Sequence, residues 1–103
     1  MLIVQLQMRH DDANERVAAF LREALERVFP AFAEQSDEQA QWINFEIATE
    51  DIDPVWTALL VDLRGDAASF AKLQQRWVVV AEGDHGWDDY RMLAHFDPSV
   101  RVD

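Results

Sequence analysis

The hydrophobic pattern at the start of the chain has two different periods. From residue 2 to residue 8, every second position is apolar, which predicts a strand with Leu2, Val4, Leu6 and Met8 on one face. Apolar residues then recur at helical spacing and predict an amphipathic helix over about residues 12–29. Pro30 should end this helix, because its ring removes a backbone donor and clashes with the preceding turn.

The middle of the chain predicts a second strand and contains one ambiguous run. Residues 34–41 are polar and are expected to form a loop, whereas the alternation of residues 42–47 predicts a half-buried strand. Residues 55–63 fit two patterns. Their Val, Trp and Thr favour a strand, but the apolar spacing after Asp53 and Pro54 fits a helix. We favour the strand and keep the helix as the alternative.

The last third of the chain predicts a helix, a glycine-containing loop and a final strand. Asp66 is the expected cap of the helix, which either continues through residues 76–81 or gives way to a strand there. Gly83 and Gly86 indicate a loop, and alternation over residues 90–96 predicts the closing strand.

Together these elements predict a single α+β domain over residues 1–103. With a strand at residues 55–63 the order is β-α-β-β-α-β, which is typical of a ferredoxin-like plait. That fold is an antiparallel four-stranded sheet with two helices on one face. Right-handed crossovers would place its first and last strands side by side. The alternative order is β-α-β-α-α-β-β, in which residues 54–64 are helical.

A plait leaves one sheet face without helices, and we expect this face to bind a protein. The partner-binding candidates there are Trp42, Trp56, Leu60 and Leu93. Two tryptophans beside leucines would form an apolar patch of the kind that marks contact sites. The commonest interaction through such a patch is self-association as a homodimer. The alternative is that the tail or an extra strand covers the face. The full outward set is Ile3, Gln5, Gln7, Trp42, Asn44, Glu46, Trp56, Leu60, Leu93 and His95.

Charge narrows the choice of partner. The chain has 20 Asp and Glu against nine Lys and Arg, a net charge of −11, and no basic residue lies between Arg27 and Arg64. This balance argues against nucleic acid, which is bound by cations. The acidic stretch is either a solvated surface or the site of an inhibitor or immunity-type partner of a basic protein such as a nuclease. The acidic partner-binding candidates are Glu34, Asp37, Glu38, Glu50, Asp51 and Asp53.

Composition excludes several other classes of protein. Without cysteine there is no disulfide and no thiolate metal site, and no run reaches the ~20 apolar residues that a membrane span needs. Half of the residues are hydrophobic, which is enough for a folded core. We therefore expect a cytoplasmic protein that does not bind membranes.

Two short segments concentrate groups that could bind metal or transfer protons. They are residues 10–12, which begin with His10, and residues 84–90, which include Asp84, His85 and Asp89. Neither has the spacing of a known metal motif, and no serine lies in a nucleophile motif. A small metal- or ligand-binding enzyme centred on His10 and His85 is the third hypothesis. The sequence favours a non-enzymatic binding module without catalytic residues, metal or cofactor.

Overall fold

In the part of the chain that the structure describes, the fold combines five strands with three helices. The computed structural model describes residues 1–9, 15–37, 39 and 41–102. Its elements are β1 (Leu2–Arg9), α1 (Glu15–Val28), β2 (Ala33–Asp37), β3 (Trp42–Thr49), α2 (Ile52–Leu63), α3 (Ala67–Gln74), β4 (Trp77–Gly83) and β5 (Gly86–His95).

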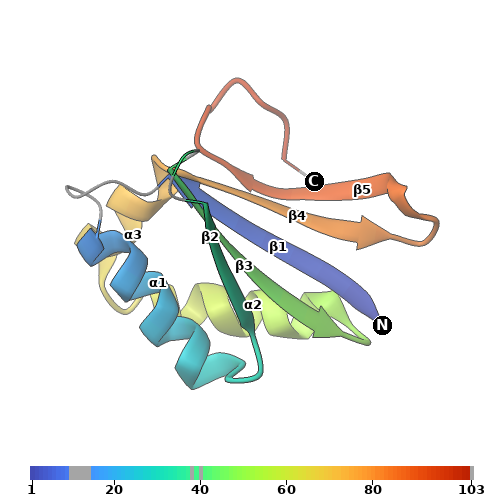
Figure 1. Cartoon of the computed structure of the whole chain (residues 1–103), viewed down its shortest axis with the longest axis horizontal. Helices are drawn as coiled ribbons and strands as arrows, with labels where there is room; N and C mark the ends of the chain where they lie inside the picture. Colours follow the sequence, from blue (N-terminus) through green and yellow to red (C-terminus); the bar gives the residue numbers. More distant parts are fainter. Residues whose placement is uncertain (10–14, 38, 40, 103) are drawn as a thin grey trace.

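The strands form one antiparallel sheet in the order β2-β3-β1-β4-β5, with β1 at its centre (Figure 1). The α+β class is as predicted, but the order of the predicted four-stranded plait is not matched. The strand predicted at residues 55–63 is a helix. The sheet contains β2, which was not predicted, and β4, which was one of the two possibilities for residues 76–81. The predicted last strand, β5, pairs with β4 at the sheet edge and does not lie beside β1. The alternative order, with residues 54–64 helical, differs from the structure in lacking β2.

The three helices lie on one side of the sheet (Figure 1). Along β1 and β3 every second side chain is buried under them, and the residues between are half-buried on the other side. The residues on the helix side form one core with the buried sides of α1, α2 and α3. None of the helices in the described residues is long and apolar enough to cross a membrane.

Residues 52–63 form a helix, so the prediction of a strand there was wrong. Ile52, Leu59 and Leu63 are buried at helical spacing, whereas Val61 is 65% exposed on the opposite side. Pro54 lies in the first turn, where a helix tolerates the missing N–H group. The Thr49 hydroxyl accepts from the backbone N–H of Asp51 at 3.3 Å and thereby fixes the chain that enters α2.

The other ambiguous segments are strands. Residues 76–81 contribute to β4, which pairs with β1 and β5 and so lies within the sheet instead of folding over it. The polar loop predicted at residues 34–41 was wrong in part, because Ala33–Asp37 pairs with β3 as a strand whose residues are all exposed. The first helix, expected at 12–29, is seen over Glu15–Val28, and its predicted caps lie outside the described residues.

The predicted cap of α3 is present. The backbone N–H of Ser69 donates to Asp66 Oδ1 at 3.1 Å, and the Ser69 hydroxyl donates to Oδ2 at 2.8 Å. These two hydrogen bonds hold the pKa of the Asp66 carboxyl below its ordinary value. A carboxyl with a lowered pKa stabilises the fold above its unfolded-state pKa, and this contribution is lost as the pH falls through the folded-state pKa.

The cap should therefore make part of the stability acid-sensitive. We expect Asp66→Ala to lower the thermal unfolding midpoint at about pH 7, and the difference from wild type to shrink at about pH 3. Asp66→Asn is the control, because asparagine caps helices without ionising. Its midpoint should depend less on pH than that of the wild type. A difference between wild type and Asp66→Ala that stays constant down to acid pH would contradict this role.

Candidate functional site

The sheet face opposite the helices carries rows of side chains that cross several strands. The register places Asn44 opposite Gln7 of β1 and opposite Gln35 of β2, so that three amides lie side by side. In the next row, Trp42 lies between Asp37 of β2 and Arg9 of β1. Registered partners point to the same side of a sheet, and the two rows therefore share one surface.

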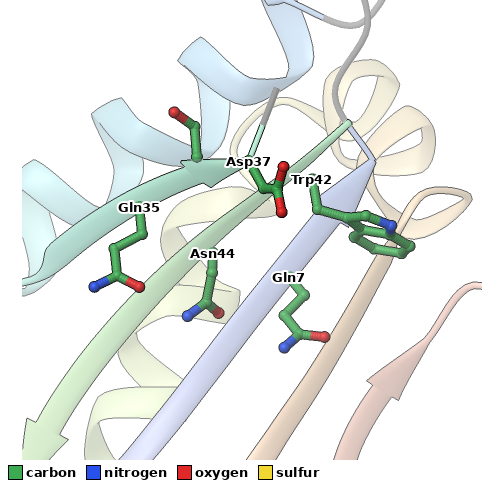
Figure 2. A pocket seen from close by; sticks show the side chains of 6 residues that line it. Gln7, Gln35, Asp37, Trp42 and Asn44 are labelled. Atoms are coloured by element: carbon green, nitrogen blue, oxygen red, sulfur yellow. The ribbon is translucent and has the colours of Figure 1, made fainter. Parts of the chain in front are cut away.

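A hollow of about 400 Å³ lies over these rows. Figure 2 shows the indole of Trp42 extending from β3 across the end of β1, with the Asp37 carboxylate beside it and the amides of Gln7 and Asn44 below. Trp42, Gln7 and Asn44 are half-buried. The lining residues are Gln7, Gln35, Ser36, Asp37, Trp42 and Asn44.

The Glu46 carboxylate orients the side-chain amides of Gln5 and Asn44. Gln5 Nε2 donates to Glu46 Oε1 at 3.2 Å, and Asn44 Nδ2 donates to the same oxygen at 3.3 Å. Gln7 Nε2 lies 3.5 Å from Gln5 Oε1 and extends this network along β1. Because Nδ2 of Asn44 is committed to Glu46, its Oδ1 is turned away and is buried without a hydrogen-bond partner within the described part of the chain.

Of the four residues predicted to form an apolar patch, only Trp42 lies on this face. Trp56 and Leu60 belong to α2 and pack against the core on the helix side, and the Trp56 ring lies 5.7 Å from that of Trp77. Leu93 is buried in the core, at a register shift where β5 has an extra residue. The predicted patch of two tryptophans is therefore not formed, and the open face is more polar than expected.

The first acidic candidates lie along and after β2. Glu34 forms an ion pair with Arg22 of α1 at 2.7 Å, so part of its charge is neutralised. Asp37 lines the hollow beside Trp42 and accepts from the backbone N–H of Gln39 at 3.0 Å. Glu38 lies outside the described residues.

The other acidic candidates lie at the opposite end of β3. Glu50 and Asp51 are exposed between β3 and α2, and Asp53 pairs with Arg91 at 3.0 Å. A second hollow of about 380 Å³ lies there, and Arg91 is part of its lining. The acidic residues that line this second hollow are Asp51, Asp53, Glu82, Asp84 and Asp89. The acidic stretch is thus divided between two ends of the sheet.

Only the second of the two candidate clusters for metal or acid–base chemistry, residues 84–90, lies in the part of the chain that the structure describes. His10 lies outside the described residues. His85 is exposed in the β4–β5 turn, where its Nδ1 lies 3.0 Å from Asp89 Oδ2, and this contact lowers the pKa of the Asp89 carboxyl. Within residues 1–9, 15–37, 39 and 41–102, no group of three His, Cys, Asp or Glu side chains could hold a metal ion.

The sequence missed two residues of the Trp42 hollow, Gln35 and Ser36. Both lie on β2, which has no buried face and therefore no hydrophobic period. One signal remained in β3. A strand inside a sheet pairs with a neighbouring strand on each side, so the outward residues Trp42 and Asn44 indicated that a further strand could lie beside them. Comparisons with protein-family models, with curated proteins and with solved structures find no match for this chain.

Proposed function

We propose that this protein is a non-enzymatic binding module whose open sheet face receives a basic protein. The observation that carries the proposal is the hollow beside Trp42, which combines an indole, a carboxylate and three amides on a face without helices. The proposal joins two hypotheses from the sequence, because the open face supplies the site and the negative charge selects the partner.

The chemistry of this face suits recognition. Amide side chains both donate and accept hydrogen bonds, and they do not titrate near neutral pH as an acid–base catalyst must. A half-buried tryptophan in a hollow is a common anchor of protein interfaces. The Glu46 network holds the amides of Asn44 and Gln7 in place before a partner arrives, which lowers the entropy cost of binding.

Net charge favours a basic partner over a second copy of this chain. Two molecules with a charge of −11 each repel one another at long range, whereas the same field speeds the approach of a cationic protein. The open face itself contributes Asp37 and Glu46 to this field. We therefore place a basic protein ahead of the homodimer.

Site-specific photo-crosslinking in cells of the protein's own organism tests this function. A photoreactive residue replaces Val80 or Ala48, which share the open face with Gln5 and Ile3 through the registers of β1. The control replaces Val61, which is exposed on α2 in the helix layer. We expect adducts to one basic protein from positions 80 and 48, and a much lower yield from position 61.

Three outcomes would overturn the proposal. One is an adduct formed equally well from position 61, which would remove the role of the open face. Another is an adduct of two copies of this chain as the main product, which would make the homodimer the function of the face. The third is the absence of adducts from positions 80 and 48. Light scattering on the purified protein distinguishes the second outcome from crosslinking after chance collision.

A further inference from the structure

We propose that the hollow beside Trp42 binds the guanidinium group of an arginine on the partner, an inference that rests on the proposed function. Three features of the hollow lead to this ligand: the indole, the neighbouring carboxylate and an amide oxygen that no donor of residues 1–9, 15–37, 39 and 41–102 reaches. Each attracts a planar cation with several N–H donors, and arginine is the side chain that has this chemistry.

The indole and the carboxylate lie side by side because of the strand register. Trp42 and Asp37 are directly opposite on β3 and β2, which brings paired side chains to neighbouring positions on one surface. Tryptophan gives the strongest cation–π attraction of the aromatic side chains, and arginine is its more frequent partner. A guanidinium stacked on the Trp42 ring can therefore turn its N–H groups toward Asp37 (Figure 2).

The amide row supplies a further acceptor. Asn44 cannot exchange its nitrogen and oxygen, because the oxygen would then face the Glu46 carboxylate that now accepts from Nδ2. Asn44 Oδ1 is consequently turned to the side on which Gln7 lies (Figure 2), and it has no hydrogen-bond partner among the described residues. A buried acceptor without a donor is costly, and a donor that displaces a neighbouring side chain of the hollow and reaches this oxygen relieves the cost.

The charge and size of the hollow agree with one arginine side chain. Among the lining residues that the structure describes, Asp37 is acidic and none is basic, and the volume of about 400 Å³ leaves room for a guanidinium and the neighbouring peptide. Arg9 ends the Trp42 row on the β1 side, but it is exposed and is not part of the lining. The second hollow differs, since Arg91 already lies among its carboxylates.

A titration followed by two-dimensional NMR tests the site with a defined probe, N-acetylarginine amide. The controls are the corresponding citrulline compound, which has the same shape without the charge, and the lysine compound. We expect the arginine probe to shift the indole N–H of Trp42 and the side-chain amide of Asn44 in a saturable manner. The lysine compound should bind more weakly, and the citrulline compound should shift neither signal. Loss of one indole signal in Trp42→Phe assigns Trp42.

Two pairs of variants separate this site from general attraction to an acidic protein. Trp42→Ala and Asp37→Asn should each weaken binding of the arginine probe about tenfold. Their matched controls are Trp87→Ala, which removes an exposed indole elsewhere on the surface, and Glu50→Gln, which removes the same charge at the other end of β3. The controls should stay within about twofold of the wild type. Dispersed spectra show that each variant is folded.

The inference is overturned if citrulline or lysine binds as well as arginine, or if the shifts occur around Asp53 and Asp89 instead. The two proposals can fail separately. Crosslinking of a basic protein from position 80 that is unchanged in Trp42→Ala and Asp37→Asn would reject the arginine site and keep the binding face. Saturable arginine binding without any crosslinked protein would reject the protein-binding function alone.

Discussion

Replacing Trp77 by alanine should lower the free energy of unfolding by about 3–5 kcal/mol, the largest effect that we expect from a single side chain. Trp77 is 2% exposed, and its ring lies 5.7 Å from Trp56 and 5.9 Å from Phe70. It joins β4 to both α2 and α3, so its removal leaves a cavity between the sheet and two helices. Domains of this size are stable by about 5–15 kcal/mol, and the variant should be close to unfolding. Urea unfolding followed by circular dichroism measures the loss.

A double-mutant cycle then tests the position of Trp56. Trp56→Ala combined with Trp77→Leu, which removes the second ring, should show a coupling of about 0.5–1.5 kcal/mol, the range for aromatic pairs in contact. Trp87→Ala is the control, because Trp87 is 42% exposed and its loss should change stability by no more than about 0.5 kcal/mol. A coupling near zero would mean that Trp56 does not pack on Trp77, and it would contradict the position of Trp56 on the helix side of the sheet.

In the elements that were predicted correctly, one side is buried, and this imposes a regular spacing of apolar residues along the sequence. In β1 and β3 one face lies under the helices, so apolar and polar residues alternate without interruption. In α1 the buried residues from Val17 to Leu25 follow the helical spacing of the sequence. A pattern is readable from sequence alone where the two sides of an element meet different surroundings.

The segment Ile52–Leu63 was misassigned because composition was weighed above spacing. Its β-branched and aromatic residues favour strands by small amounts, and packing against a core readily outweighs such preferences. A helix over this segment would have Val61 and Ala58 on its outer side, and these apolar residues counted against the helix. In the structure the segment is a helix and both residues are exposed. The strand β2 was missed for the opposite reason, because it is polar on both faces and its partner β3 alone defines it.

These errors explain why several candidate site residues lie at other positions than predicted. Trp56 and Leu60 lie on the helix side of the sheet because they belong to α2 and not to a strand. Trp42 lies on the open face as predicted, because β3 was predicted correctly. Leu93 became buried at an irregularity that no period reveals. Val79 pairs with Ala94 and Val80 with Met92, which leaves Leu93 as an extra residue that breaks the alternation of β5.

The two glycines of the β4–β5 hairpin should respond very differently to alanine. A Cβ atom at Gly83 would overlap the backbone carbonyl oxygen and the carboxylate of Asp89, so one strand must move away from the other. We expect Gly83→Ala to cost about 3 kcal/mol, the upper part of the range for overpacked sites. At Gly86, apart from the adjacent residues of the chain, no atom of the described structure lies within 4 Å of such a Cβ, and only the φ of 78° opposes the substitution. Gly86→Ala should therefore cost about 1 kcal/mol.

Asparagine at position 86 provides the matched control, because it tolerates a positive φ better than alanine does. Gly86→Asn should recover most of the stability that Gly86→Ala loses, whereas no side chain should be tolerated at position 83. Equal losses for the two alanine variants would contradict the close approach of Asp89.

If that approach is correct, Gly83→Ala should also displace the Asp89 carboxylate from His85, because the same strand holds both contacts. The pKa of the Asp89 carboxyl should then rise toward its ordinary value, and NMR titration of the side-chain carboxyl measures this.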